Sequence, residues 1–173
     1  KRMLPVMLKV ASHFPEYQFV VAGVSSLEKS LYKGIMGKAD VFLVENQTYE
    51  LLQNSSAALV TSGTATLETA LFSVPEVVCY KATGFSYHLA KWMIKVKFIS
   101  LVNLIMDKEV VKELIQGDLT EDNLVKELNQ LLHDGNRQRQ LLQDYEDLQD
   151  RLGNAGASEK AAEVVFEALK ARK

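Results

Sequence analysis

Short apolar runs alternate along the first part of the chain with stretches whose apolar residues recur at helical spacing. The runs at residues 18–22, 41–44, 58–61 and 76–80 predict strands. The stretches between them predict helices, which we expect over residues 4–14, from Ser25 or Ser26 to 34–37, over 48–54, and over 64–72. This alternation favours an α/β fold with a Rossmann-like parallel sheet and helices on both faces.

From Thr120 onward the apolar spacing is helical throughout. Residues 120–133 and 137–152 predict two helices, and a last helix follows the break at 153–156. We therefore expect a Rossmann-like domain over 1–133, followed by C-terminal helices over 134–173. An apolar stripe on these helices either packs on the same domain or pairs with another part of a longer protein or another chain.

The strand predicted at 58–61 runs into the turn Ser62-Gly63-Thr64 and then into a helix. Such a turn presents unpaired backbone N–H groups and the positive end of a helix dipole, which together bind phosphate. Glu68, four residues after Thr64, lies on the same helix face, within reach of a sugar joined to that phosphate. The segment suggests a nucleotide-sugar site. The alternative is an ordinary turn with Ser62 or Thr64 as N-cap and Glu68 in solvent.

Asn103 is a polar residue inside the apolar run 99–105, which follows a predicted fifth strand. A buried amide needs hydrogen-bond partners, so Asn103 either caps a short helix or faces the same crevice as Glu68. Glu109 and Glu113 lie four residues apart, a spacing that predicts two solvated carboxylates on one helix face.

Residues 84–98 combine aromatic and aliphatic side chains with lysines and leave almost no polar face. A helix that is apolar nearly all round is usually buried in the core. Aromatic rings interleaved with lysines also suit a membrane interface or a lipid acceptor. Both interpretations stay open.

Composition excludes several classes of function. The chain has 173 residues and a net charge of −2, so its bulk electrostatics do not indicate nucleic-acid binding. Its one cysteine, Cys79, allows no intramolecular disulfide, and its three histidines lie too far apart for a metal motif. We expect no metal and no cofactor. No apolar run is long enough for a transmembrane helix, and the interrupted run at 1–14 is not a signal peptide.

Five segments in order, 57–68, 75–81, 85–95, 99–105 and 109–116, resemble the lipid-A-disaccharide synthases. These are inverting glycosyltransferases (family 19) of the GT-B type, which has two Rossmann domains. The resemblance implies that this chain is the C-terminal, donor-binding half. Its implied substrate-binding residues are Ser62, Gly63 and Thr64 at the UDP, Glu68 at the ribose, Asn103 from a Leu-Pro-Asn element, and Glu113 and Gln116 from a Glu-Leu-Leu-Gln-like element. Val102 replaces the proline of the Leu-Pro-Asn element.

The resemblance also implies a reaction: transfer of 2,3-diacylglucosamine from UDP to 2,3-diacylglucosamine 1-phosphate, a hexosyltransferase step of lipid A biosynthesis. It places the protein in the cytoplasm, peripheral to the inner membrane of a Gram-negative bacterium, with residues 85–98 at the membrane surface. Because the chain begins at Lys1 within a helical pattern, we expect a piece of a longer protein. The preceding part would supply the acceptor domain, a glycine-serine-arginine loop and the catalytic base, so this chain alone would be inactive.

Two competing interpretations remain. The first is another UDP-sugar enzyme of GT-B type, such as a UDP-N-acetylglucosamine 2-epimerase. The second is a non-catalytic nucleotide-binding module whose C-terminal helices pair with another chain.

Overall fold

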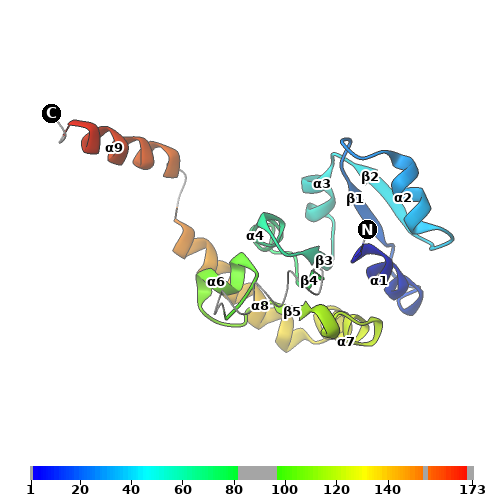
Figure 1. Ribbon diagram of the computed structural model, residues 1–173. Coiled ribbons are helices and arrows are strands. Elements are labelled where there is room, and N and C mark those ends of the chain that lie inside the picture. Colours follow the sequence, from blue (N-terminus) through cyan, green and yellow to red (C-terminus); the bar gives the residue numbers. More distant parts are fainter. Residues whose placement is uncertain (1, 82–96, 154–155, 171–173) are drawn as a thin grey trace.

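A computed structural model describes residues 2–81, 97–153 and 156–170 (Figure 1). The expected α/β fold with parallel strands and flanking helices is confirmed. Within the described residues the strands form two sheets, a two-stranded one in the order β1-β2 and a three-stranded one in the order β3-β4-β5, with every pairing parallel. The strands are β1 (Val20–Gly23), β2 (Phe42–Glu45), β3 (Ala58–Thr61), β4 (Glu76–Tyr80) and β5 (Lys112–Ile115).

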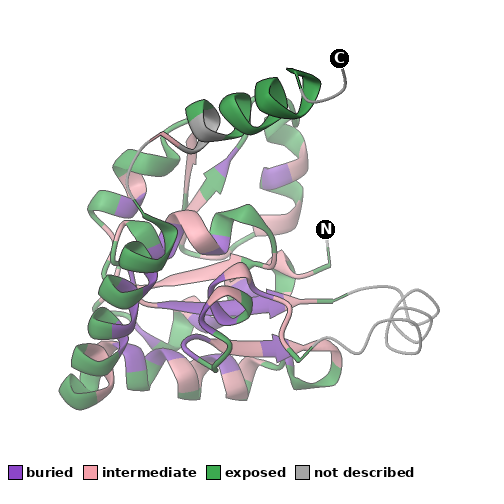
Figure 2. Ribbon diagram, turned by 90° about the vertical axis from the view of Figure 1, so that its left-hand side faces the viewer, coloured by how far each residue is buried: buried purple, intermediate pink, exposed green. Residues whose placement is uncertain are grey.

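Helices connect consecutive strands and cover the sheets (Figures 1 and 2). Those of the first part are α1 (Leu4–Lys9) with the 3-10 helix η1 (Val10–His13), α2 (Lys29–Met36), α3 (Thr48–Gln53) and α4 (Thr64–Leu71). Those of the second part are α6 (Leu101–Met106), the 3-10 helix η2 (Gln116–Asp118), α7 (Glu121–His133), α8 (Gly135–Leu152) and α9 (Ala157–Lys170).

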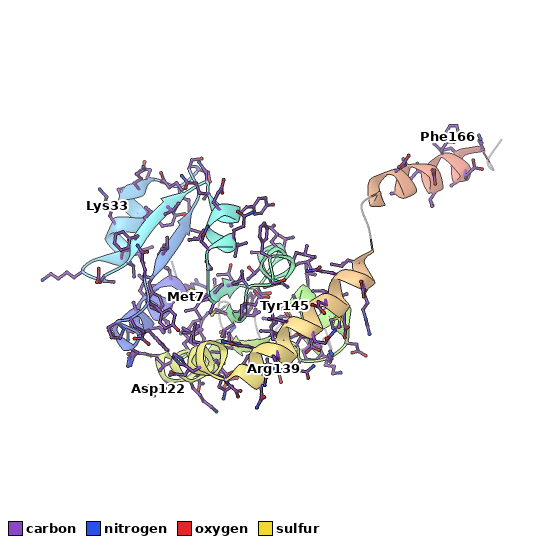
Figure 3. All side chains as sticks on the ribbon, turned by 180° about the vertical axis from the view of Figure 1, so that it is seen from behind. Met7, Lys33, Asp122, Arg139, Tyr145 and Phe166 are labelled. Atoms are coloured by element: carbon purple, nitrogen blue, oxygen red, sulfur yellow. The ribbon has the colours of Figure 1, made fainter. Side chains whose placement is uncertain are left out.

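The core lies around β4, whose first four residues are buried. Apolar side chains of α1, α6, α7 and α8 pack against it, and α8 contributes Leu141, Tyr145 and Leu148. Burying these side chains removes apolar area from water, the main term that stabilises the sheet. Figure 3 shows Tyr145 and Met7 within this packed body, whereas Phe166 lies on α9, which projects away from it. The apolar residues Val164, Val165, Phe166 and Leu169 of α9 are exposed.

Two predicted helices differ from the structure. Neither Ser25 nor Ser26 caps α2, because that helix begins at Lys29 and its N-cap residue is Glu28. The Ser25 N–H instead donates to the Asn46 side-chain oxygen at 3.1 Å, which ties the loop after β1 to the loop after β2. The prediction that Glu109 and Glu113 share a helix was also wrong, because Glu113 lies in β5 opposite Val78.

The strand at β5 is explained by its neighbours in space. Val110 and Val111, which lead into β5, are fully buried, and Leu114 of the strand faces the core. The segment therefore runs through the packed interior beside β4. β5 also follows the 99–105 run, whereas we expected the fifth strand before it. Of the segment at 84–98, only Lys97 and Phe98 lie within the described residues, so both interpretations of that segment stay predictions.

Candidate functional site

A sharp turn joins β3 to α4 at the carboxyl end of the three-stranded sheet. Gly63 sits in this turn with φ 150° and ψ −163°, a region that is essentially restricted to glycine. Among the described residues, apart from its two chain neighbours, no heavy atom lies within 4 Å of where a Cβ would stand, so the backbone conformation, and not crowding, requires glycine.

The amino end of α4 has no side-chain cap among the described residues. Gly63 is its N-cap residue, and within the described residues no side chain accepts a hydrogen bond from its first amides. Thr64 is exposed, whereas Thr66 turns inward and donates its hydroxyl to the Gly63 carbonyl at 2.8 Å. The alternative in which Ser62 or Thr64 caps the helix was therefore wrong. Uncapped amides at a helix start favour an anion.

Glu68 lies one turn further along α4 and is half-buried. It lines a shallow hollow of about 280 Å³ with Asn46, which follows β2, and with Thr48 and Tyr49 at the start of α3. Tyr49 stacks on Phe72 with 5.3 Å between ring centroids, so the rim of this hollow is aromatic. A carboxylate beside an aromatic rim combines an acceptor for hydroxyl groups with a surface for a planar ring.

Asn103 is fully buried, and protein groups occupy both ends of its side-chain amide. The nitrogen donates to the Val111 carbonyl at 2.8 Å and to Glu113 at 2.9 Å. The oxygen accepts from the amides of Val110 at 2.8 Å and Val111 at 2.9 Å. The predicted helix cap was wrong for this residue, because the N-cap of α6 is Ser100. Asn103 instead joins α6 to the start of β5.

The Glu113 carboxylate lies at the centre of the same network. It accepts from the amide of Ile99 at 3.0 and 3.1 Å and from the amide of Ser100 at 2.9 Å, in addition to Asn103. Ser62 joins the network from the turn after β3, because its hydroxyl donates to the Ile99 carbonyl at 2.9 Å. Ser62, Asn103 and Glu113 are thus brought together, although they lie far apart in the sequence.

Gln116 follows β5 directly and is unusual in two ways. Its φ is +54°, which is uncommon for any residue but glycine, asparagine or aspartate. Its side-chain nitrogen is buried and has no hydrogen-bond partner among the described residues. A strained backbone and an unused donor at a strand end are typical of a ligand-binding position.

Sequence reasoning missed a second buried polar pair, at the amino end of β4. Glu76 and Tyr145 are almost fully buried, and neither carboxylate oxygen nor the phenol oxygen has a side-chain hydrogen-bond partner among the described residues. Burial raises the pKa of Glu76 to about 9. Burial, and secondarily the charge of Glu76, raise the pKa of the Cys79 thiol to about 12. The sequence signal that could have revealed this buried acid is a glutamate at the start of an apolar strand run.

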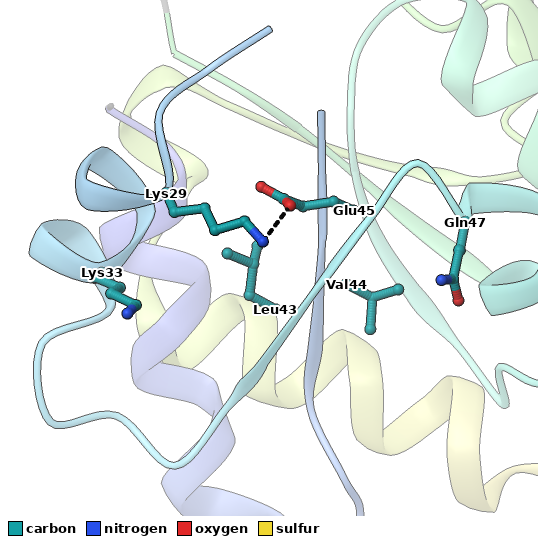
Figure 4. Close-up of a pocket in the computed structure, with 6 residues that line it drawn as sticks. All are labelled: Lys29, Lys33, Leu43, Val44, Glu45 and Gln47. Carbon is teal, nitrogen blue, oxygen red and sulfur yellow. Dashed lines mark ion pairs between the residues drawn. The ribbon is translucent and has the colours of Figure 1, made fainter. Parts of the chain in front are cut away.

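A second hollow, of about 570 Å³, lies between α2 and β2 (Figure 4). Its charged groups include Lys29 and Glu45, which pair at 2.8 Å, and Lys33. Glu45 therefore neutralises one of the two lysines that line this hollow.

None of the helices in the described part of the chain has both the length and the apolar character that crossing a bilayer requires.

Comparisons with known proteins point to one family. The family model described as lipid-A-disaccharide synthetase matches residues 2–168. The lipid-A-disaccharide synthase of Syntrophus aciditrophicus (strain SB) is 37% identical over 176 residues, covering 98% of this chain and 46% of the relative. That of Myxococcus xanthus (strain DK1622) is 34% identical, with the same coverage of 98% and 46%. That of Pectobacterium carotovorum subsp. carotovorum (strain PC1) is 34% identical, with coverage of 98% and 45%. The chain spans about half the length of the curated relatives it matches.

Proposed function

The chain belongs to the lipid-A-disaccharide synthase family, a family of glycosyltransferases, and we propose that it is the donor-binding half of such an enzyme. The observation that carries this proposal is the open start of α4 behind Gly63, with Glu68 one turn away. This pair of features offers one position for a diphosphate and one for the sugar attached to it.

The proposed donor is a UDP-activated 2,3-diacylglucosamine. Its diphosphate lies against the amides at the start of α4, where Thr64 contributes an exposed hydroxyl. Its ribose hydroxyls donate to the Glu68 carboxylate, and the base lies toward the aromatic rim at Tyr49. Gln116 extends the site from the end of β5. Its side-chain N–H group, which has no partner among the described residues, donates a hydrogen bond to the UDP-sugar.

The contribution of this half to the reaction is electrostatic. Inversion at the sugar carbon expels UDP, and negative charge develops on the leaving phosphate. Fixed amides at a helix start stabilise that charge without reorganising. The hydroxyl of the acceptor, 2,3-diacylglucosamine 1-phosphate, loses its proton to a general base, which we assign to the other half of the enzyme. The C-terminal helices beyond residue 133 complete the domain, and residues 85–98 meet the lipid substrates at the inner-membrane surface.

Replacing Glu68 tests the site. In the full-length protein Glu68→Ala should weaken UDP binding about tenfold, since a hydrogen bond to a charged acceptor is lost. The matched control is Glu50→Ala on the neighbouring helix α3, an exposed acid that should leave the affinity unchanged. Titration calorimetry with UDP measures both. An unchanged affinity for Glu68→Ala would remove this residue from the site.

The reaction product distinguishes the proposed transferase from the competing class, a UDP-sugar epimerase of GT-B type. Incubation of the full-length protein with both acylated substrates should yield the disaccharide and UDP. An epimerised sugar, or UDP binding without any product, would contradict the proposed transfer.

A further inference from the structure

One peptide unit connects two parts of the site that come from different strands. The carbonyl of Ile99 accepts from the Ser62 hydroxyl at 2.9 Å. The amide of the same peptide unit, that of Ser100, donates to Glu113 at 2.9 Å. The peptide between residues 99 and 100 therefore bridges the carboxylate on β5 and the turn after β3.

This bridge has little freedom to move. The amide of Ile99 donates to both carboxylate oxygens of Glu113, and Asn103 donates to one of them. Asn103 is in turn fixed by the backbone of Val110 and Val111. Hydrogen bonds to a carboxylate are shorter and stronger than neutral ones, so the charge of Glu113 holds the loop at 99–100 in one position.

We propose that Glu113 is a positioning residue for the donor site. Its carboxylate fixes the 99–100 peptide, the peptide fixes Ser62, and Ser62 fixes the direction in which the open amides of α4 point. Glu113 acts through this bridge and does not touch the donor. The proposal rests on the proposed function, because the orientation of the turn matters only if the turn binds UDP.

The bonding of Glu113 supports this indirect role. Three protein N–H groups, on Ile99, Ser100 and the Asn103 side chain, already donate to its two oxygens, the Ile99 amide being shared between them. A carboxylate in direct contact with a diphosphate would also be repelled by it. A carboxylate that holds a loop from behind avoids that repulsion.

A double-mutant cycle tests the bridge in the full-length protein. Glu113→Gln and Ser62→Ala should each weaken UDP binding about tenfold, the size of one hydrogen bond. The double variant should also lose about tenfold, because both changes break the same connection. A loss of about a hundredfold would mean independent effects and would overturn the proposal. Glu109→Gln, the same change at an exposed acid in the same segment, should leave the affinity unchanged.

Amide hydrogen exchange provides a readout that needs no UDP. Glu113→Gln should accelerate exchange at Ser62 and Thr66, whose amides are bonded to the Cys79 and Gly63 carbonyls. Acceleration confined to residues 99 and 100 would overturn the proposal. If Glu113→Gln does not fold, Ser62→Ala gives the reciprocal measurement, with faster exchange expected at Ser100 and unchanged exchange overturning the bridge. Failure of wild-type protein to bind UDP would contradict the proposed function alone, since exchange still decides the bridge.

Discussion

Two glutamates on neighbouring parallel strands have opposite surroundings. Glu113 on β5 accepts hydrogen bonds from Ile99, Ser100 and Asn103. Glu76 on β4 is 1% exposed, and its carboxylate has no partner among the described residues. Burial then favours the neutral acid and raises the pKa of Glu76 to about 9. The comparison teaches that backbone amides decide whether a carboxyl group in this sheet serves as a charged connector or as a neutral core residue.

The largest expected effect is the loss of the network around Glu113. Asn103→Leu, a change of similar volume, leaves two backbone amides and one carbonyl without their partner and removes one of the donors to Glu113. We expect a loss of about 4 kcal/mol in the free energy of unfolding. Urea denaturation measures it, with Asn129→Leu on the exposed face of α7 as the control. A loss below about 1 kcal/mol would show that the network contributes little.

The next largest effect, that of replacing Glu76, should be a gain in the free energy of unfolding. Glu76→Gln keeps the shape of the neutral acid and removes its ionisation, so it should stabilise the fold by about 2 kcal/mol at pH 8. In the folded wild-type protein the pKa of Glu76 is raised from 4.5 to about 9. The stabilisation that neutral Glu76 contributes is therefore fully present below pH 4.5 and is lost as the pH rises to about 9. The gain should therefore shrink at pH 5.

Thermal unfolding at the two pH values measures this difference. The control is Glu146→Gln, an exposed acid on α8. Equal gains at pH 5 and pH 8 would mean that Glu76 is ionised in the folded protein and that the contrast with Glu113 is wrong.

The smallest effect is expected next to Glu76. The Tyr145 hydroxyl has no side-chain partner among the described residues, so Tyr145→Phe should change the stability by less than about 1 kcal/mol. Tyr32→Phe is the contrast, because that hydroxyl accepts from the Val24 amide at 3.1 Å and its loss should cost about 1 kcal/mol. Denaturant unfolding of the two variants compares them. A larger loss for Tyr145→Phe than for Tyr32→Phe would mean that Tyr145 has a partner.

Where local pattern and packing agree, the fold could be predicted from the sequence. β3 and β4 have the predicted bounds because each is an apolar run closed by small or turn-forming residues. The segment from Glu109 to Gln116 was misread, since its apolar residues fit both a helical and a strand period. Pairing with β4, which is distant in the sequence, decides in favour of the strand.

The candidate site divides in the same way. The turn at Gly63 and the acid at Glu68 could be predicted, because a strand, a glycine turn and a helix follow one another in the sequence. The partners of Asn103 could not, since they come from β5 and from the loop before it. The positive φ of Gln116 and the isolation of Glu76 depend on surrounding elements and have no local signature.

The two sheets have a consequence for stabilisation by a ligand. Within the described residues no strand pairing joins β1-β2 to β3-β4-β5, yet the hollow at Glu68 takes residues from both sides: Asn46, Thr48 and Tyr49 after β2, and Glu68 on α4. A nucleotide held there would make non-covalent contacts with both sides and so link the segment after β2 to α4. Saturating UDP should then raise the midpoint of thermal unfolding.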